Sequence, residues 1–430
     1  MTKRDENSRG ILPKEVTKMR NGLRKIGLGL VAVGLSIALL LTGTIPVCEA
    51  GPDEKVKIGI AGPFTGAIAE TIPIYYGVMD HLKWLNEQGG INGVKVEYLW
   101  EDIGRSPTTM SISAHKRLVS AGVVVIHNYV STGVEVLAPK LEKDGVPYMF
   151  NASPTPQMVT KPMWLFGVDG GYLSVGASII KYFDGTWEGE RPLRVAAIAY
   201  DYSSARTAMQ GTIDYCDEQE GVEFVHQEIV PFLGTIDTTT EWLRTINKGP
   251  HIVVIACTGV SFVTLMKDCV RLGIKEKVAA LCGAVHVADE RYVPIVGEKV
   301  LEGLYMLNIV PTTQERVPQM EPIIEAARKY RGWESKRVPS VYIMGWVESV
   351  VVCEAIRLAI EKVRLENLNG HAVRDAIFSI KGFDTGLIPP ITITENKPWV
   401  TDYYSMCQFQ RGVLVRVSDW FKGVHQLKIE

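Results

Sequence analysis

The sequence predicts an α/β protein with two doubly wound, Rossmann-like lobes, and three observations support this fold class. Short apolar strands alternate with amphipathic helices along most of the chain after residue 51, a pattern typical of parallel sheets covered by helices. Hydroxyl-rich turns directly follow several of these strands. The chain has 430 residues, which is too long for one ordinary core. We therefore expect two similar lobes, joined by three crossovers, with a ligand cleft between them.

The first 50 residues differ in composition from the rest of the chain. Basic residues precede an uncharged apolar run at 26–43, and a small residue stands at Ala50. This order predicts a secretory signal peptide over residues 1–50, and therefore export to the periplasm. Met19 begins a signal of more ordinary length than Met1 does, so both are candidate start residues. The apolar run is also just long enough to span a bilayer, so a membrane-anchored form is the alternative.

Strands and helices alternate in the first half of the exported part. Strands are predicted at Val56–Ala61, Val94–Trp100, Val123–Ile126 and Val146–Phe150. Tyr75–Gln88 is an amphipathic helix that ends at a glycine pair, and Asn92-Gly93 makes a tight turn into the next strand. A second helix covers Pro107–Ala121. The last two strands each run into a turn that opens a helix.

The second half repeats this alternation and then changes character. Strands are expected at Leu193–Ala199, Val222–Val230, His251–Cys257, Val278–Cys282 and Gly303–Ile309. The helices between and after them are expected at Ser203–Glu220, Thr238–Asn247, Ser261–Leu272, near Ala288, and at Glu315–Arg331, Ser340–Arg364 and Asn369–Ile380. The final stretches alternate like antiparallel strands, at Ile391–Thr394, Tyr403–Gln410 and Val413–Val417.

Each lobe is expected to be discontinuous in sequence. The candidate crossings are Gly167–Gly171, Asn308–Thr312 and Thr385–Pro390. They assign residues 51–170 and 310–388 to lobe 1, and residues 171–309 and 389–430 to lobe 2. A cleft between lobes joined in this way can close on a ligand by a hinge motion.

Composition and motifs argue against several classes of function. Apolar residues make up 46% and charged residues 22%, as in ordinary globular proteins, and a net charge of −2 gives no reason to expect a nucleic-acid partner. The chain lacks a phosphate-loop ending, a Gly-x-Ser-x-Gly elbow and a His-Glu-x-x-His motif. It has no Cys-x-x-Cys pair and no His cluster beside its cysteines, so we expect no metal site. Because no catalytic constellation is found, we expect no enzyme, and we expect no cofactor. The cysteine spacing assigns no disulfide.

The candidate ligand-binding residues stand just after strand ends. A strand–turn–helix unit places free backbone N–H groups and the positive end of a helix dipole at the carboxyl edge of a sheet, where carboxylates bind. The candidates are Phe64, Ser131, Thr132, Ala152 and Ser153 in the first half, and Tyr202, Thr258 and His286 in the second. Each hydroxyl alone is equally well explained as a helix cap. Similarly, Phe64 fits a plain β–α turn, and His286 fits a solvated or core histidine.

Three segments together resemble the solute-binding proteins of branched-chain (hydrophobic) amino-acid ABC transporters, which have the type I periplasmic binding protein fold. They are Lys57–Gly66, Asn86–Glu97 and Ser131–Pro156, and the resemblance covers residues 54–430. It implies a monomeric, non-enzymatic receptor that delivers a small solute to a membrane permease. It also implies that the carboxylate of the ligand is held by Ser131 and by Ala152 and Ser153 or Pro154. Residues around Tyr202–Ala205 and Thr258 contribute from lobe 2.

The chain departs from this family at one expected position. Leucine-type members hold the ligand's ammonium group with an acidic residue after a lobe 2 strand, whereas Cys282–His286 contains no acid. A buried ammonium without a partner is unfavourable. The ligand is then a hydrophobic amino acid only if another acid, such as Asp201, substitutes. Otherwise it is a carboxylate without the amine, a related amide or an aromatic acid. The alternative function is the ligand-sensing domain of a membrane-anchored receptor.

Overall fold

The computed structural model describes residues 55–66, 68–234, 237–427 and 429, and the predicted leader at 1–50 lies outside them. The described chain forms two sheets. Each sheet, with the helices that contact it, is called a lobe here. None of the described helices is both long enough and apolar enough to cross a membrane.

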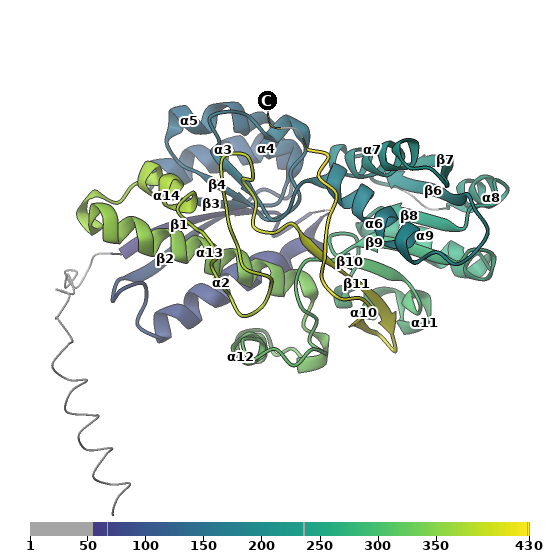
Figure 1. Ribbon diagram of the computed structural model, residues 1–430. Helices are drawn as coiled ribbons and strands as arrows, with labels where there is room; N and C mark the ends of the chain where they lie inside the picture. Colours follow the sequence, from purple (N-terminus) through teal and green to yellow (C-terminus); the bar gives the residue numbers. More distant parts are fainter. Residues whose placement is uncertain (1–54, 67, 235–236, 428, 430) are drawn as a thin grey trace, which may run out of the picture. The chain divides into compact units, whose positions relative to one another are not determined.

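Lobe 1 is built on a five-stranded parallel sheet with the order β2-β1-β3-β4-β5. Its strands are β1 (Lys55–Gly62), β2 (Lys95–Asp102), β3 (Ile126–Asn128), β4 (Tyr148–Phe150) and β5 (Leu165–Gly167). Its helices are α2 (Ile72–Glu87), α3 (Pro107–Ser120), α4 (Ser131–Leu137), α5 (Leu141–Asp144), α12 (Met320–Arg331), α13 (Ser340–Val363) and α14 (Gly370–Ile377). Figure 1 shows α2 and α13 side by side, although they lie far apart in sequence.

Lobe 2 contains the larger sheet, with the order β12-β11-β10-β9-β8-β6-β7. Its strands are β6 (Leu193–Tyr200), β7 (Val222–Val230), β8 (Ile252–Ala256), β9 (Ala280–Ala284), β10 (Tyr305–Asn308), β11 (Tyr403–Gln410), β12 (Val413–Arg416) and β13 (Phe421–Lys422). Its helices are α6 (Tyr172–Thr186), α7 (Ser203–Glu218), α8 (Thr239–Ile246), α9 (Gly259–Arg271), α10 (Val293–Val296) and α11 (Glu298–Leu301). β6 to β10 pair in parallel, and β11 to β13 add antiparallel pairs.

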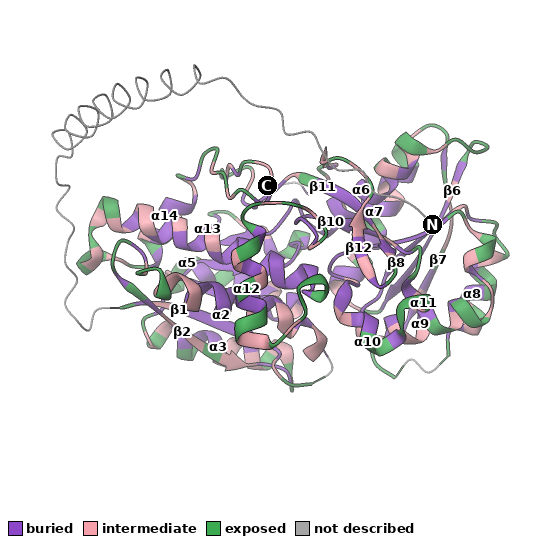
Figure 2. Cartoon of the chain, turned by 90° about the horizontal axis from the view of Figure 1, so that it is seen from below, coloured by how far each residue is buried: buried purple, intermediate pink, exposed green. Residues whose placement is uncertain are grey.

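The predicted fold class is confirmed. β8 is buried along its whole length, and β6 is buried at all but one position. Such continuous apolar runs are typical of parallel strands with both faces covered. The burial pattern in Figure 2 agrees, because buried positions concentrate in the sheets and in the inner helix faces.

Some elements differ from the prediction. Ile391–Thr394 is not a strand: isolated bridges join Phe383 to Ile391 and Thr394 to Lys397, and the prolines that flank the segment cannot donate to a ladder. The helix expected near Ala288 is a single 3-10 turn, η5 (Glu290–Tyr292), followed by α10. The sequence analysis missed β5, whose three residues are too few to show a period.

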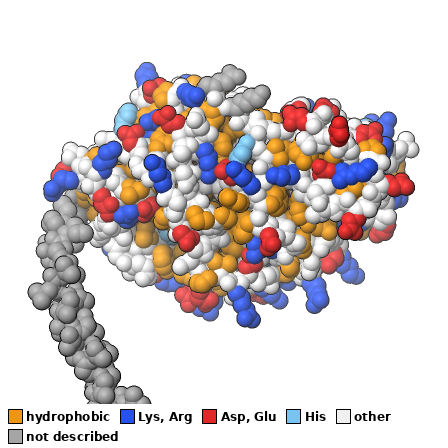
Figure 3. All heavy atoms as spheres, in the orientation of Figure 1, with side chains coloured by type: hydrophobic (Ala, Val, Ile, Leu, Met, Phe, Trp, Pro, Cys, Tyr) orange, Lys and Arg blue, Asp and Glu red, His pale blue; other side chains and the backbone are white. Residues whose placement is uncertain are grey.

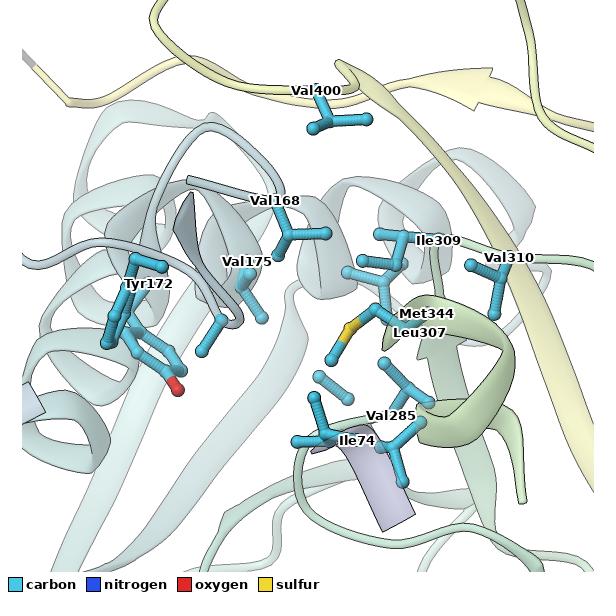
Figure 4. Packing of buried hydrophobic residues seen from close by; sticks show 14 of the residues in the cluster. Ile74, Val168, Tyr172, Val175, Val285, Leu307, Ile309, Val310, Met344 and Val400 are labelled. Carbon is cyan, nitrogen blue, oxygen red and sulfur yellow. The ribbon is translucent and has the colours of Figure 1, made fainter. Parts of the chain in front are cut away.

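The last connection between the lobes runs beside the first. Gly167 N donates to Pro398 O at 3.0 Å, and Val400 N donates to Gly167 O at 3.0 Å. Thr401 N donates to Val168 O at 3.1 Å. The chain therefore still lies against β5 after the predicted crossing at Thr385–Pro390, and it joins the second sheet only at β11. Figure 4 shows Val168 and Val400 among the buried apolar side chains of this region.

A pair of glycines brings two helices into contact in each lobe. In lobe 1, a Cβ on Gly77 of α2 would lie 2.0 Å from Tyr342 O, and a Cβ on Gly345 of α13 would lie 2.0 Å from Ile74 O. In lobe 2, Gly176 of α6 and Gly211 of α7 meet in the same way, with Cβ positions 2.0 Å from Ala208 O and Leu173 O. Real Cβ atoms cannot approach a backbone oxygen so closely, so only glycine permits these crossings.

Candidate functional site

Hydrogen bonds join the strand-end turns of the two lobes. Thr132 Oγ1 lies 3.2 Å from the hydroxyl of Tyr202, and Ser153 Oγ lies 3.1 Å from Nε2 of His286. Further bonds run from Ser203 Oγ to Glu135 Oε1 at 2.6 Å and from Thr258 Oγ1 to Glu70 Oε1 at 3.4 Å. The lobes are therefore in contact across the cleft, and the structure is a closed form.

Two cavities lie where these turns meet. Together with the space at their mouths that is open to solvent, the first measures about 470 Å³ and the second about 320 Å³. Their linings share residues from both lobes: Tyr129, Tyr172, Tyr200, Ser204 and Thr258. Of the residues predicted from the sequence, Thr258 lines both cavities, His286 lines the first, and Ser131 and Tyr202 line the second. We treat the two spaces as parts of one candidate site.

The other predicted residues lie next to these cavities or away from them. Ser153 is buried and contacts His286, Ala152 is fully buried, and Thr132 bonds to Tyr202. The structure does not bring Phe64 to either cavity. Its ring packs against Tyr75 and Trp100, with centroids 5.5 and 4.9 Å away.

Asp201, the possible substitute for the missing acid, points to solvent. Its side chain is 61% exposed, and its Oδ1 accepts a hydrogen bond from Arg206 Nε at 2.8 Å. It is therefore unavailable to a ligand in the closed cleft.

The turn before Ser131 is fixed by side chains that bond to its backbone. Asn128 Oδ1 accepts from Val130 N at 2.8 Å, and the hydroxyl of Tyr75 accepts from Tyr129 N at 2.9 Å. Ser131 is then the first residue of α4 and is 3% exposed. The amides of a first helical turn have no carbonyl partner within their own helix. They are therefore donors that a carboxylate in the cleft can use.

The turn that carries Ala152 and Ser153 is anchored from beneath by a buried polar network. Asn151 Nδ2 donates to Oε2 of Glu348 on α13 and lies 3.1 Å from Nδ1 of His127. Burial lowers the pKa of His127 to about 4 and raises the pKa of Glu348 well above its ordinary value. Burial therefore favours the neutral form of both side chains, which avoids a charge in the core.

Glu348→Gln is expected to raise the free energy of unfolding by about 1–3 kcal/mol at pH 7, and this gain should vanish below pH ~4.5. When folding raises the pKa of an acid, the folded protein loses stability as the pH rises above the pKa that the acid has in the unfolded state. Glutamine cannot ionise, so the variant does not suffer this loss. Urea unfolding at several pH values measures the difference. Glu361→Gln, exposed on the same helix, is the control. A gain independent of pH would contradict the assignment.

The sequence analysis did not identify the charged groups that lie next to the site. Glu70 lies between β1 and α2, and burial raises its pKa. Arg291 in η5 is buried; it forms an ion pair with Asp289 at 3.1 Å and donates to His286 O at 2.9 Å. The sequence signal for Asp289 and Arg291 was the run Asp289–Tyr292, which comes shortly after Cys282–His286, where an acid was expected. Glu70 had no signal, because its approach to Thr258 depends on how the lobes meet.

His286 is uncharged in this setting. Burial lowers its pKa to about 3, and the nearby guanidinium of Arg291 contributes in the same direction. Its Nδ1 has no hydrogen-bond partner among the described residues. The contact with Ser153 therefore lacks the third group that orients the histidine of a hydrolytic triad. The pair is better explained as a contact that closes the cleft.

Side chains that could bind a metal ion are spread over the part of the chain that the structure describes. No group of three or more His, Cys, Asp or Glu side chains there is arranged to hold a metal ion. The cysteines at 216, 257, 269, 282, 353 and 407 are all buried free thiols. The walls of the candidate site therefore consist of hydroxyls, amides, aromatic rings and apolar side chains, and the charged side chains of Glu70 and Arg291 lie beside them.

Solved structures with the same fold have varied ligands. A branched chain amino acid ABC transporter from Thermus thermophilus with bound valine aligns with a TM-score of 0.76 at 20% identity, covering 86% of this chain and 97% of that one. A fatty acid ABC transporter substrate-binding protein from Thermomonospora curvata gives 0.75 at 17%, covering 86% and 93%. A solute-binding protein from Rhodopseudomonas palustris HaA2 in complex with p-hydroxybenzoic acid gives 0.71 at 17%, covering 86% and 97%.

The sequence comparisons assign the family directly. A search of curated proteins found no match to this chain. A family model described as periplasmic binding protein matches residues 55–410, which is most of the chain and spans both lobes. The segments that carried the resemblance, the two parallel sheets and the cleft between them agree with this match. The chain therefore belongs to the periplasmic binding protein family.

Proposed function

We propose that this protein is the periplasmic solute receptor of an ABC importer. It acts as a monomer, binds a small carboxylate-bearing solute between its lobes, and delivers that solute to a membrane permease. The observation that carries the proposal is the meeting of turns from both lobes around the shared cavities, with Ser131 from lobe 1 and Thr258 from lobe 2 on their walls. The family match and the ligands named for the similar structures support it.

Closure explains how such a receptor reports that it is loaded. A ligand that contacts both lobes binds the closed form better than the open form, and so shifts the population toward closure. The bonds between Thr132 and Tyr202 and between Ser153 and His286 belong to the closed form. They add to its stability without requiring that these side chains touch the ligand.

The charged side chains beside the cavities bear on whether the solute carries an ammonium group. Asp201 is paired outside the cleft, whereas Glu70 presents a half-buried carboxylate beside Thr258. A hydrophobic amino acid can place its ammonium group near Glu70, while an amide or an aromatic acid needs no such partner. Native mass spectrometry of protein purified without refolding would give the mass of a co-purified ligand.

Ser131→Ala is expected to weaken ligand binding about tenfold while leaving the fold intact. The variant removes one hydroxyl donor to an anionic group, and such a bond contributes about 1.5 kcal/mol or more. Calorimetry with valine, 4-hydroxybenzoate and straight-chain carboxylates measures the effect. Ser113→Ala, on the exposed face of α3, is the matched control. Equal affinity of wild type and Ser131→Ala for every ligand that binds would rule out this carboxylate site.

The sensing domain of a membrane-anchored receptor is the second candidate. The apolar run at 26–43 favours it, since a retained run of this length can span a bilayer. Amino-terminal sequencing of the exported protein separates the two. A chain beginning near Gly51 supports the periplasmic receptor, whereas an intact leader in the membrane fraction supports the anchored form.

A further inference from the structure

One carboxylate oxygen joins three segments of the chain beside the cleft. Glu135 lies on α4 of lobe 1, and its Oε1 accepts hydrogen bonds from Thr155 Oγ1 at 2.7 Å and from Ser203 Oγ at 2.6 Å. Thr155 comes two residues after Ser153, in the neighbouring turn of lobe 1. Ser203 is the first residue of α7 in lobe 2. Glu135 therefore ties α4 both to a turn of its own lobe and to the second lobe. These three side chains are called the latch here.

The bonds of the latch belong to a strong class. Hydrogen bonds from a hydroxyl to a carboxylate are shorter than those between neutral groups and roughly twice as strong. The carboxylate of Glu135 also lies at the start of α7, where the N-cap residue Tyr202 makes no side-chain cap. The positive end of the helix dipole favours a negative charge at this place. Closure of the lobes therefore gives the carboxylate a partner that it lacks when they are apart.

The latch lies next to the ligand site but outside its walls. None of its three residues lines either cavity, whereas Ser131, one turn earlier on α4, lines the second. Thr132 stands between them and bonds to the hydroxyl of Tyr202. A solute in the cavities therefore does not need to touch the latch in order to be held by it.

The two bonds of Glu135 differ in what happens when the lobes separate. The bond from Thr155 lies within lobe 1 and persists, whereas the bond from Ser203 exists only in the closed form. Loss of the second bond destabilises the closed form relative to the open one. A bound solute leaves after the cleft opens, so this loss raises the rate of release. It does not change the open form, to which the solute first binds.

We propose that Glu135 is the positioning residue of a latch that holds the closed form and slows the release of every solute by the same factor. This inference rests on the proposed function. It assigns to the α4–α7 contact a control of residence time that is separate from the choice of solute, which the cavity walls make.

The test is stopped-flow tryptophan fluorescence of the full exported protein with valine, 4-hydroxybenzoate and hexanoate. Ser203→Ala should raise the dissociation rate constant about tenfold for each ligand that binds, because it removes a bond to a charged group. The association rate constant should not change. Glu135→Gln keeps an acceptor oxygen but loses the charge, so it should speed release to a smaller extent. Glu142→Gln, exposed on α5 of the same lobe, is the matched control and should release ligands as wild type does.

A double-mutant cycle tests whether the two lobes act through this bond. Once Glu135→Ala has removed the acceptor, the further change Ser203→Ala should hardly alter the dissociation rate constant. Alanine is favourable within a helix, so Ser203→Ala tests the latch even if Glu135→Ala, which also takes the partner of buried Thr155, fails to fold.

The outcomes separate this inference from the proposed function. If wild type binds no small carboxylate, both proposals fail. If ligands bind but Ser203→Ala releases them at the wild-type rate, only the latch fails. It also fails if the increase differs from ligand to ligand, if association slows, or if the effects of Glu135→Ala and Ser203→Ala simply add. If Ser131→Ala binds every ligand as wild type does while Ser203→Ala speeds release uniformly, the carboxylate site fails and the latch is supported.

Discussion

Gly77→Ala is expected to destabilise the protein by about 3 kcal/mol, at the upper end for an overpacked core. The new methyl group would lie 2.0 Å from Tyr342 O and 2.9 Å from Trp346 N. Both atoms belong to the backbone of α13 and cannot rotate away, so the two helices must separate. Because α2 and α13 form the main helix pair of lobe 1 (Figure 1), their separation would open buried packing along both. Urea unfolding measures the loss.

Gly185→Ala is the matched control for that experiment. Gly185 lies in α6, and a Cβ there would meet nothing within 4 Å. Alanine is a better helix former than glycine by about 1 kcal/mol, so this variant should be neutral or slightly more stable. If Gly77→Ala behaved like Gly185→Ala, the close crossing of α2 and α13 would be disproved.

Asp80→Ala is expected to cost about 3–5 kcal/mol, because it leaves a partly buried guanidinium without its counter-charge. Asp80 on α2 is fully buried, and both of its oxygens accept hydrogen bonds from Arg331 on α12, at 2.6 and 2.7 Å. The hydroxyl of Tyr342 donates to the same carboxylate at 3.2 Å. The guanidinium also lies over the ring of Tyr76, 3.7 Å from its centroid. Removing the acid would therefore weaken the attachment of α12 to lobe 1.

An exposed ion pair between the same two helices provides the comparison. Lys329 of α12 donates to Glu87 of α2 at 2.7 Å, but both side chains are about half exposed. Surface pairs contribute little because water screens them. Glu87→Ala should therefore change the free energy of unfolding far less than Asp80→Ala, and the effect of Asp80→Ala should persist in high salt. Similar losses for both variants would contradict the role assigned to burial. Figure 3 shows other charged side chains of both signs mixed over one face of the molecule.

The sequence was sufficient to predict the alternation of strands and helices, because that pattern is local. Strands such as β6 and β8 are apolar throughout, and the helices between them have clear boundaries. By contrast, β5 is very short, and the path of residues 398–401 is set by backbone bonds to Gly167 and Val168. Contacts so distant in sequence leave no periodic signal.

The candidate site was predicted in part for the same reason. Ser131, Tyr202, Thr258 and His286 follow strand ends, and parallel sheets bring such ends to a common edge. One wall of the first cavity is formed by small residues of α6, α7 and β8, and nothing in a local pattern marks them as neighbours. Glu70 was missed because its approach to Thr258 depends on how the lobes meet, whereas the run Asp289–Tyr292 lay just beyond the segment in which an acid was expected.

The first and last connections between the lobes are hydrogen-bonded to each other, and this affects how they can move. Gly167 and Val168 are tied to the segment around Trp399 by backbone hydrogen bonds. A rotation of one segment alone would therefore strain its bonds to the other. Any hinge motion between the two sheets would bend both segments together, and in the receptor proposed above this shared bend would help the lobes return to the same closed orientation.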